Sequence, residues 1–123
     1  FFRVIRDAHP DVPVVIVEDP LYPTIRLNNY AREDITARNN AQKAFYEKLR
    51  KAGEKRIYYV SADKLLDEMK EGTVDGNHFT DLGVTYYVNA ILPTIKKALK
   101  ASPYPMFRST SVGFSGSFSY SPQ

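Results

Sequence analysis

The chain has 123 residues, enough for one domain and too few for two well-cored ones. Its 43% hydrophobic and 25% charged residues are ordinary for a globular protein and count against disordered, collagen-like and disulfide-scaffold classes. The absence of cysteine excludes disulfides and thiolate chemistry. The net charge is +3, and its basic residues gather near predicted helix ends, where they complement the helix dipole. No nucleic-acid partner is therefore expected.

Two segments have the composition of strands from a parallel sheet. Residues 13–19 (PVVIVED) form a continuous apolar run between prolines, which predicts a strand buried on both faces. Residues 56–62 (RIYYVSA) are rich in aromatic and β-branched side chains and predict a second strand. Residues 1–10 read as a helix or its approach. Residues 20–32, with two prolines and two asparagines, predict a loop after a strand end, where functional residues often lie.

Helical periodicity follows each strand. Residues 33–52 predict an amphipathic helix that Gly53 ends, and residues 62–70 a short helical stretch. Thr80 can cap a last helix, which Pro93 should kink or divide. The inner faces are expected to comprise Ile35, Ala41, Ala44, Phe45, Leu49 and Ala52 in the earlier helix, and Leu82, Tyr86, Tyr87, Ala90, Ile91, Ile95 and Leu99 in the last. The alternation of strands and helices predicts an α/β fold with a parallel sheet.

The strand count points to a larger unit. Two strands cannot supply the neighbours that a parallel strand buried on both faces requires. We therefore expect an N-terminal half of the domain or a companion chain to complete this one. Residues 1–100 belong to that domain, and residues 101–123 form a Ser- and aromatic-rich tail. Within the tail, residues 111–120 alternate like a strand, which either pairs with a sheet edge or stays disordered.

The stretch TVDGNHFTDLG, residues 73–83, combines an acid and a base. Asp75 precedes His78 by three residues across Gly76, so one short loop could supply a carboxylate that orients an imidazole base. The alternative from spacing alone is a turn before a helix, with His78 on its rim. A metal site of Asp75, His78 and Asp81 is disfavoured, because three ligands from one short segment rarely close a site.

The block V-D-G-N-H-F-T-D-L-G resembles the last sequence block of SGNH hydrolases, also called GDSL-type lipases and esterases. The surrounding segments resemble the C-terminal half of that fold over roughly residues 1–100. The resemblance implies a three-layer α/β/α flavodoxin-like sandwich, no metal or other cofactor, and Asp75 and His78 as the acid and base of a Ser-His-Asp triad. It slightly favours a secreted or periplasmic location. Phe79 stands where the family usually has proline, and this difference is expected to loosen the turn.

The nucleophile of such a triad is not identifiable in this chain. Ser61 follows a strand but lacks the Gly-flanked turn of a nucleophile elbow, and Ser115 in GFSGS misses G-x-S-x-G by one position. The resemblance therefore implies part of a serine esterase that acts on small esters, for example acylated carbohydrates, with this chain supplying the Asp and His. The alternative is a non-catalytic interaction module derived from the same family.

Residues that follow the first predicted strand are further candidates for contact with a substrate. Glu18 and Asp19 follow the first strand, where α/β sites form, so they either border a substrate pocket or end the strand in solvent. Tyr22 is a further candidate substrate contact, as are Arg26 and Tyr30, although a packed loop would explain all three. His9 fits a surface loop. No run reaches the ~20 apolar residues that cross a bilayer.

Overall fold

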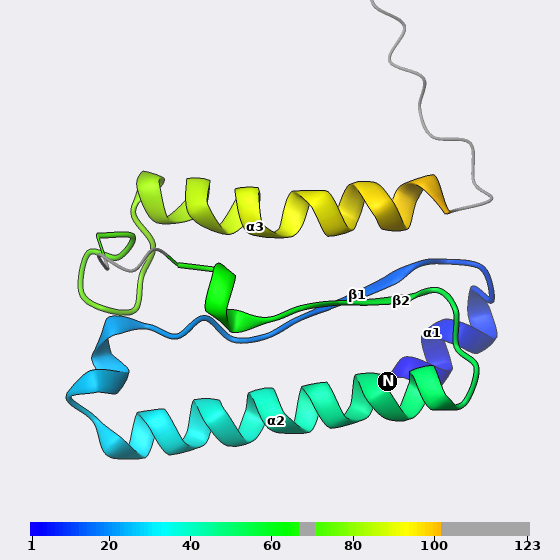
Figure 1. Ribbon diagram of the computed structural model, residues 1–123, viewed down its shortest axis with the longest axis horizontal. Helices are drawn as coiled ribbons and strands as arrows, with labels where there is room; N and C mark the ends of the chain where they lie inside the picture. Colours follow the sequence, from blue (N-terminus) through cyan, green and yellow to red (C-terminus); the bar gives the residue numbers. More distant parts are fainter. Residues whose placement is uncertain (67–70, 102–123) are drawn as a thin grey trace, which may run out of the picture.

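The computed structural model of the chain describes residues 1–66 and 71–101. In chain order the elements are α1 (Phe2–Ala8), β1 (Val14–Val17), the 3-10 helix η1 (Pro23–Arg26), α2 (Asn29–Lys51), β2 (Ile57–Val60), the 3-10 helix η2 (Ala62–Lys64) and α3 (Asp81–Lys100). The strands are parallel, with α2 on one face and α3 on the other (Figure 1). The predicted α/β sandwich around a parallel sheet is confirmed.

Within the described residues, β1 has a strand neighbour on one side only. The N–H of Val14 donates to the carbonyl of Arg56, just before β2, at 2.9 Å, and the N–H of Glu18 donates to the carbonyl of Val60 in β2 at 3.0 Å. Because alternate residues of a strand point their backbone groups to opposite edges, Val15 and Val17 direct theirs away from β2. All four β1 residues are half-buried, whereas the sequence predicts burial on both faces. A two-stranded sheet leaves this edge without the strand that would bury it.

Helix α2 begins earlier than predicted and turns a different face to the sheet. Asn28 caps it by accepting a hydrogen bond from the N–H of Ala31 at 3.1 Å, so the helix starts at Asn29 rather than at Glu33. The residues that face inward are Ile35, Asn39, Gln42, Tyr46 and Leu49. Ala41, Ala44, Phe45 and Ala52 were expected inside and are exposed.

The inward face of α2 contains more polar groups than its periodicity suggests. Tyr46 stacks on Tyr59 of β2, with 5.0 Å between ring centroids. Buried Asn39 accepts from the backbone N–H of Asp19 and donates to its carbonyl, both at 2.9 Å. These paired bonds satisfy the backbone just beyond β1, and this is why a polar side chain occupies an inner position.

Helix α3 runs unbroken through Pro93. The proline lacks the N–H that would bond the carbonyl of Asn89, and both residues are exposed, so water can bond the freed oxygen. Two positions of the predicted inner face differ: Leu82 is 40% exposed and Leu99 42%. The predicted helical stretch at 62–70 is a 3-10 turn over Ala62–Lys64, and its residues 67–70, like the predicted tail strand, lie outside the described residues.

Candidate active site

Residues 72–80 form a closed loop that leads into α3. Thr73 and Phe79 make an isolated antiparallel bridge. The N–H of Val74 donates to the carbonyl of His78 at 2.9 Å, and the N–H of Thr80 donates to the carbonyl of Gly72 at 3.0 Å. These bonds close the loop at its base and bring its two ends side by side.

Asp75 and His78 meet within this loop. Asp75 Oδ1 accepts from the backbone N–H groups of Asn77 at 2.9 Å and of His78 at 2.8 Å. Its other oxygen, Oδ2, lies 2.7 Å from His78 Nδ1. One carboxylate thus holds both the turn of the backbone and the imidazole ring.

The electrostatics of the pair follow from these bonds. Hydrogen bonds from the His78 N–H, the His78 ring and the Asn77 N–H, in that order, hold the pKa of Asp75 far below its ordinary value. An ionised carboxylate only accepts, so Nδ1 of the neutral ring carries the proton and Nε2 keeps its lone pair. The His78 side chain is 74% exposed, and among the described residues no hydrogen bond occupies Nε2. The ring can therefore accept a proton from a group outside the described residues.

Gly76 shapes the turn between the two side chains. Its φ of +84° lies in the left-handed region, which favours glycine. A Cβ at this position would come 2.6 Å from Thr24 Cγ2, and Thr24 Oγ1 donates to the Gly76 carbonyl at 3.1 Å. Thr24 belongs to η1, so the segment after β1 lies directly against the Asp75–His78 loop.

The far end of the loop is fixed to α3. Thr80 Oγ1 accepts from the N–H of Gly83 at 3.0 Å and caps the helix, as predicted. The same hydroxyl lies 3.3 Å from the carbonyl of Glu71. A Cβ on Gly83 would come 1.8 Å from the Gly72 carbonyl oxygen, so only glycine permits this approach of helix and loop.

Phe79 packs between two tyrosines. Its ring centroid lies 6.0 Å from that of Tyr22 and 5.5 Å from that of Tyr87 on α3. Burial, followed by the charge of Asp19 and the neighbouring Tyr87, raises the pKa of Tyr22, so its hydroxyl stays neutral at physiological pH. Phe79 therefore attaches the loop to its neighbours, and the expectation that it loosens the turn relative to proline stays a prediction.

Glu18 and Asp19 are engaged with their own neighbours rather than with His78. Glu18 accepts from the Tyr59 hydroxyl and, at 2.6 Å, from the N–H of Ala62. Burial and this contact raise the pKa of Tyr59. Asp19 pairs with Arg38 at 2.8 Å. Both acids border the strand end as expected, and their role in binding substrate stays a prediction.

The described residues offer neither an assembled triad nor a metal cluster. The Ser61 hydroxyl donates to Asp63, beyond β2, and makes no hydrogen bond to His78 among the described residues. No group of three or more His, Cys, Asp or Glu within residues 1–66 and 71–101 could hold a metal ion. Ser115 lies outside the described residues. Arg26 and Tyr30, the remaining loop candidates, are exposed, as is His9.

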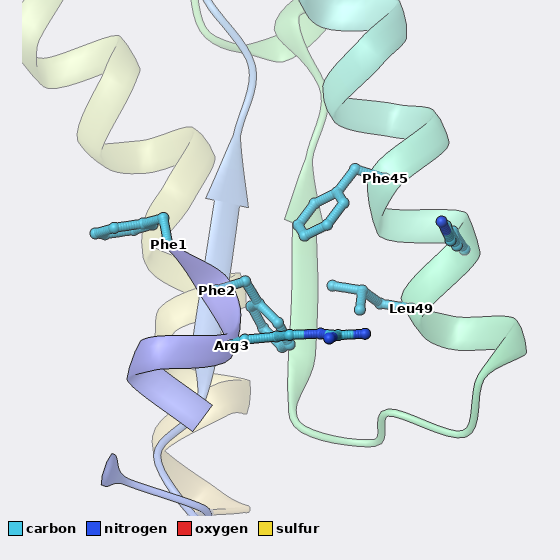
Figure 2. A pocket seen from close by; sticks show the side chains of 6 residues that line it. Phe1, Phe2, Arg3, Phe45 and Leu49 are labelled. Carbon is cyan, nitrogen blue, oxygen red and sulfur yellow. The ribbon is translucent and has the colours of Figure 1, made fainter. Parts of the chain in front are cut away.

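An apolar hollow of about 470 Å³ lies at the other end of α2, away from this loop (Figure 2). Phe2 of α1 meets Phe45 of α2 there, with 5.8 Å between ring centroids, and Phe1, Arg3, Lys48 and Leu49 also line the hollow. Phe1 is fully exposed. The hollow contains no acid or imidazole, so it is a surface for packing rather than for acid–base chemistry.

The match to a family model decides the relationship. Residues 1–96 match the model of the GDSL-like Lipase/Acylhydrolase family. This chain belongs to that family. The resemblance inferred from residues 73–83 is thus confirmed, and acyl hydrolysis is supported at the level of the family. The division at residue 100 stays a prediction.

A solved structure is similar to the GDSL-like chain. It is the crystal structure of a candidate GDSL-like lipase from Bacteroides ovatus, with 35% sequence identity and a TM-score of 0.74. The similarity covers 80% of this chain and 29% of that one. No curated protein matches the chain. Among the described residues, no helix is long and apolar enough to span a membrane.

Sequence reasoning found the acid and the imidazole but not the residues that surround them. Thr24 carries no motif, and its contact with Gly76 joins residues far apart in the chain. Asn39 gave a partial signal, because an asparagine on the inner face of a helix predicts a buried hydrogen-bond partner. The aromatic character of Phe79 was a similar clue to packing.

Proposed function

We propose that this chain supplies the acid and the base of a Ser-His-Asp triad in an acyl hydrolase, with Asp75 orienting His78. The observation that carries the proposal is the 2.7 Å contact between Asp75 Oδ2 and His78 Nδ1 in a loop whose imidazole is otherwise exposed. The carboxylate fixes the tautomer and stabilises the imidazolium that forms when Nε2 takes a proton.

The serine would come from polypeptide outside these 123 residues. The chain covers 29% of the similar lipase-like chain, so a domain of that size leaves ample sequence for a nucleophile and its oxyanion donors. The edge of β1 that lacks a strand neighbour among the described residues, and the apolar hollow between α1 and α2, offer surfaces where this remainder can pack. The supplier is either the preceding part of the same polypeptide or a companion chain.

The proposed reaction proceeds by acyl transfer to serine. The serine Oγ attacks the ester carbonyl while His78 Nε2 takes its proton, and the tetrahedral intermediate collapses when the imidazolium returns that proton to the departing alcohol. Water then attacks the acyl-enzyme with His78 again as base, which releases the acid and frees the serine. Small acyl esters, including acylated carbohydrates, are the substrate class that we propose.

A second candidate function is a non-catalytic interaction module. The same edge of β1 and the apolar hollow would serve equally well to hold a partner that has no serine. The two functions differ in one respect, the presence of a reactive serine in the assembled protein.

The test uses the assembled protein with every polypeptide it contains. A fluorophosphonate probe followed by peptide mapping should label a serine outside this sequence. His78→Ala should lower hydrolysis of p-nitrophenyl acetate roughly 10⁴-fold or more. His9→Ala is the matched control, because it removes the other histidine, which is exposed and outside the loop. Unchanged turnover in His78→Ala would show that the assignment is wrong, and no label in the wild type would favour the interaction module.

A further inference from the structure

The hydrogen bonds of Asp75 and His78 are almost all made within their own turn. Asp75 bonds the Asn77 and His78 backbone and the His78 ring, and the His78 carbonyl accepts from Val74. These bonds fix the geometry within the pair. They do not fix the direction in which the exposed imidazole points relative to the rest of the domain.

Contacts with other elements provide that external reference: Phe79 packs on Tyr87 of α3, and η1 contacts the turn itself. Among the described residues, the bond from Thr24 Oγ1 to the Gly76 carbonyl, at 3.1 Å, is the one hydrogen bond that joins residues 75–78 to another element. The ring contact of Tyr22 with Phe79 attaches the same segment on the other side of His78. The segment after β1 therefore contacts the loop at positions that flank the imidazole.

Both branches of the threonine side chain are used. The hydroxyl makes the hydrogen bond, while Cγ2 lies 2.6 Å from the point where a Cβ on Gly76 would stand. The methyl thus occupies the space that the glycine leaves open. A serine would keep the hydrogen bond and a valine would keep the shape, so the two contributions can be separated.

We propose that Thr24 is a positioning residue that aims the His78 imidazole at the serine nucleophile. The catalytic consequence rests on the proposed function, whereas the anchoring of the loop does not. A base that is misplaced by about 1 Å can lose roughly 100-fold in rate. Loss of one exposed hydrogen bond displaces the loop only part of the time, so a smaller effect on kcat follows.

The experiment compares Thr24→Val and Thr24→Ser in the assembled enzyme, with His78→Ala in the same series. Thr24→Val should lower kcat about 10-fold with KM nearly unchanged, and the NMR order parameter of the His78 amide should fall from about 0.85 towards 0.6. Thr24→Ser keeps the hydrogen bond and should stay closer to wild type than Thr24→Val in both measurements. The matched control is Thr85→Val, because Thr85 Oγ1 also donates to a backbone carbonyl, that of Asp81, at 2.9 Å but within α3.

A double variant provides a second measurement. Gly76→Ala places a Cβ against Thr24 Cγ2, and Thr24→Ser removes that methyl, so Gly76→Ala should lose less activity and less His78 order in the Thr24→Ser background. Equal losses in both backgrounds would contradict the contact.

The outcomes separate the two proposals. If Thr24→Val behaves like Thr85→Val in kcat and in the His78 order parameter while His78→Ala abolishes turnover, the positioning role is wrong and the proposed function stands. If Thr24→Val loosens the loop without lowering the kcat of a His78-dependent enzyme, the positioning role is also wrong. If His78→Ala leaves turnover unchanged, the proposed function fails and with it the catalytic role of Thr24, and the order parameter alone then decides whether Thr24 anchors the loop.

Discussion

Gly76→Ala is the sharpest perturbation of the candidate site, because the chain contains its own control. Gly53 and Gly76 both have positive φ, +90° and +84°, so alanine at either position costs roughly 1–2 kcal/mol in backbone strain. Among the described residues, a Cβ on Gly53 meets nothing within 4 Å, whereas one on Gly76 comes 2.6 Å from Thr24 Cγ2. Overpacking of this kind adds roughly 1–3 kcal/mol. We expect a loss of about 1–2 kcal/mol for Gly53→Ala and about 2–5 kcal/mol for Gly76→Ala.

Amide hydrogen exchange is the suitable assay, because an exposed loop can open without unfolding the domain. The reporters are the N–H groups of Asn77 and His78, which donate to Asp75 at 2.9 and 2.8 Å. Since about 1.4 kcal/mol corresponds to a factor of ten, Gly76→Ala should accelerate their exchange by roughly 30-fold or more. Gly53→Ala should leave these two amides unchanged. Equal exchange in wild type and Gly76→Ala would refute the close contact with Thr24 and the reasoning built on it.

Three further predictions concern the residues that hold the site. Asn39→Ala leaves the N–H and the carbonyl of Asp19 unpaired, so the free energy of unfolding in urea should fall by roughly 2–4 kcal/mol. The control is Asn40→Ala at an exposed position, which should lower it by less than about 0.5 kcal/mol. Similar losses in the two variants would contradict the paired bonds. Gly83→Ala should lower the free energy of unfolding by about 3 kcal/mol or more, because its Cβ would come 1.8 Å from the Gly72 carbonyl oxygen. A melting temperature within about 2 °C of wild type would disprove the close packing of Gly83 on Gly72. Finally, the pKa of Asp75 is lowered by folding, so its stabilisation of the loop is present above the ordinary value of about 4 and is lost as pH falls through the folded value. NMR titration of the Asp75 carboxyl carbon should therefore show a midpoint well below 4. The midpoint should still be lowered in His78→Ala, because the N–H groups of residues 77 and 78 continue to bond the carboxylate. An ordinary midpoint would be inconsistent with those backbone bonds.

Some parts of this protein follow from local sequence alone. The strands at 14–17 and 57–60, the long helix that ends before Gly53 and the helix capped by Thr80 were all predictable, because continuous apolar runs, helical periodicity and capping chemistry act between neighbouring residues. The Asp75–His78 pair belongs to the same class, since its bonds join residues two and three positions apart. Its catalytic role stays a prediction that the proposed experiments test.

Other features were decided by contacts between distant segments. The inward face of α2 includes Asn39, which bonds the backbone of Asp19, whereas the helical periodicity favoured the alanines and Phe45. The engagement of Glu18 with Tyr59 and Ala62 required β1 and β2 to be adjacent.

The contact of Thr24 with Gly76 shows the difference most clearly. The sequence by itself determined that a glycine, which permits backbone angles that other residues avoid, lies between an acid and an imidazole. Only the tertiary structure places η1 against it, because η1 follows β1, the Asp75–His78 loop lies beyond β2, and the parallel pairing puts both strand ends at the same edge of the sheet. Local sequence therefore determined the chemistry of the pair, and the fold decided which neighbours hold it in place.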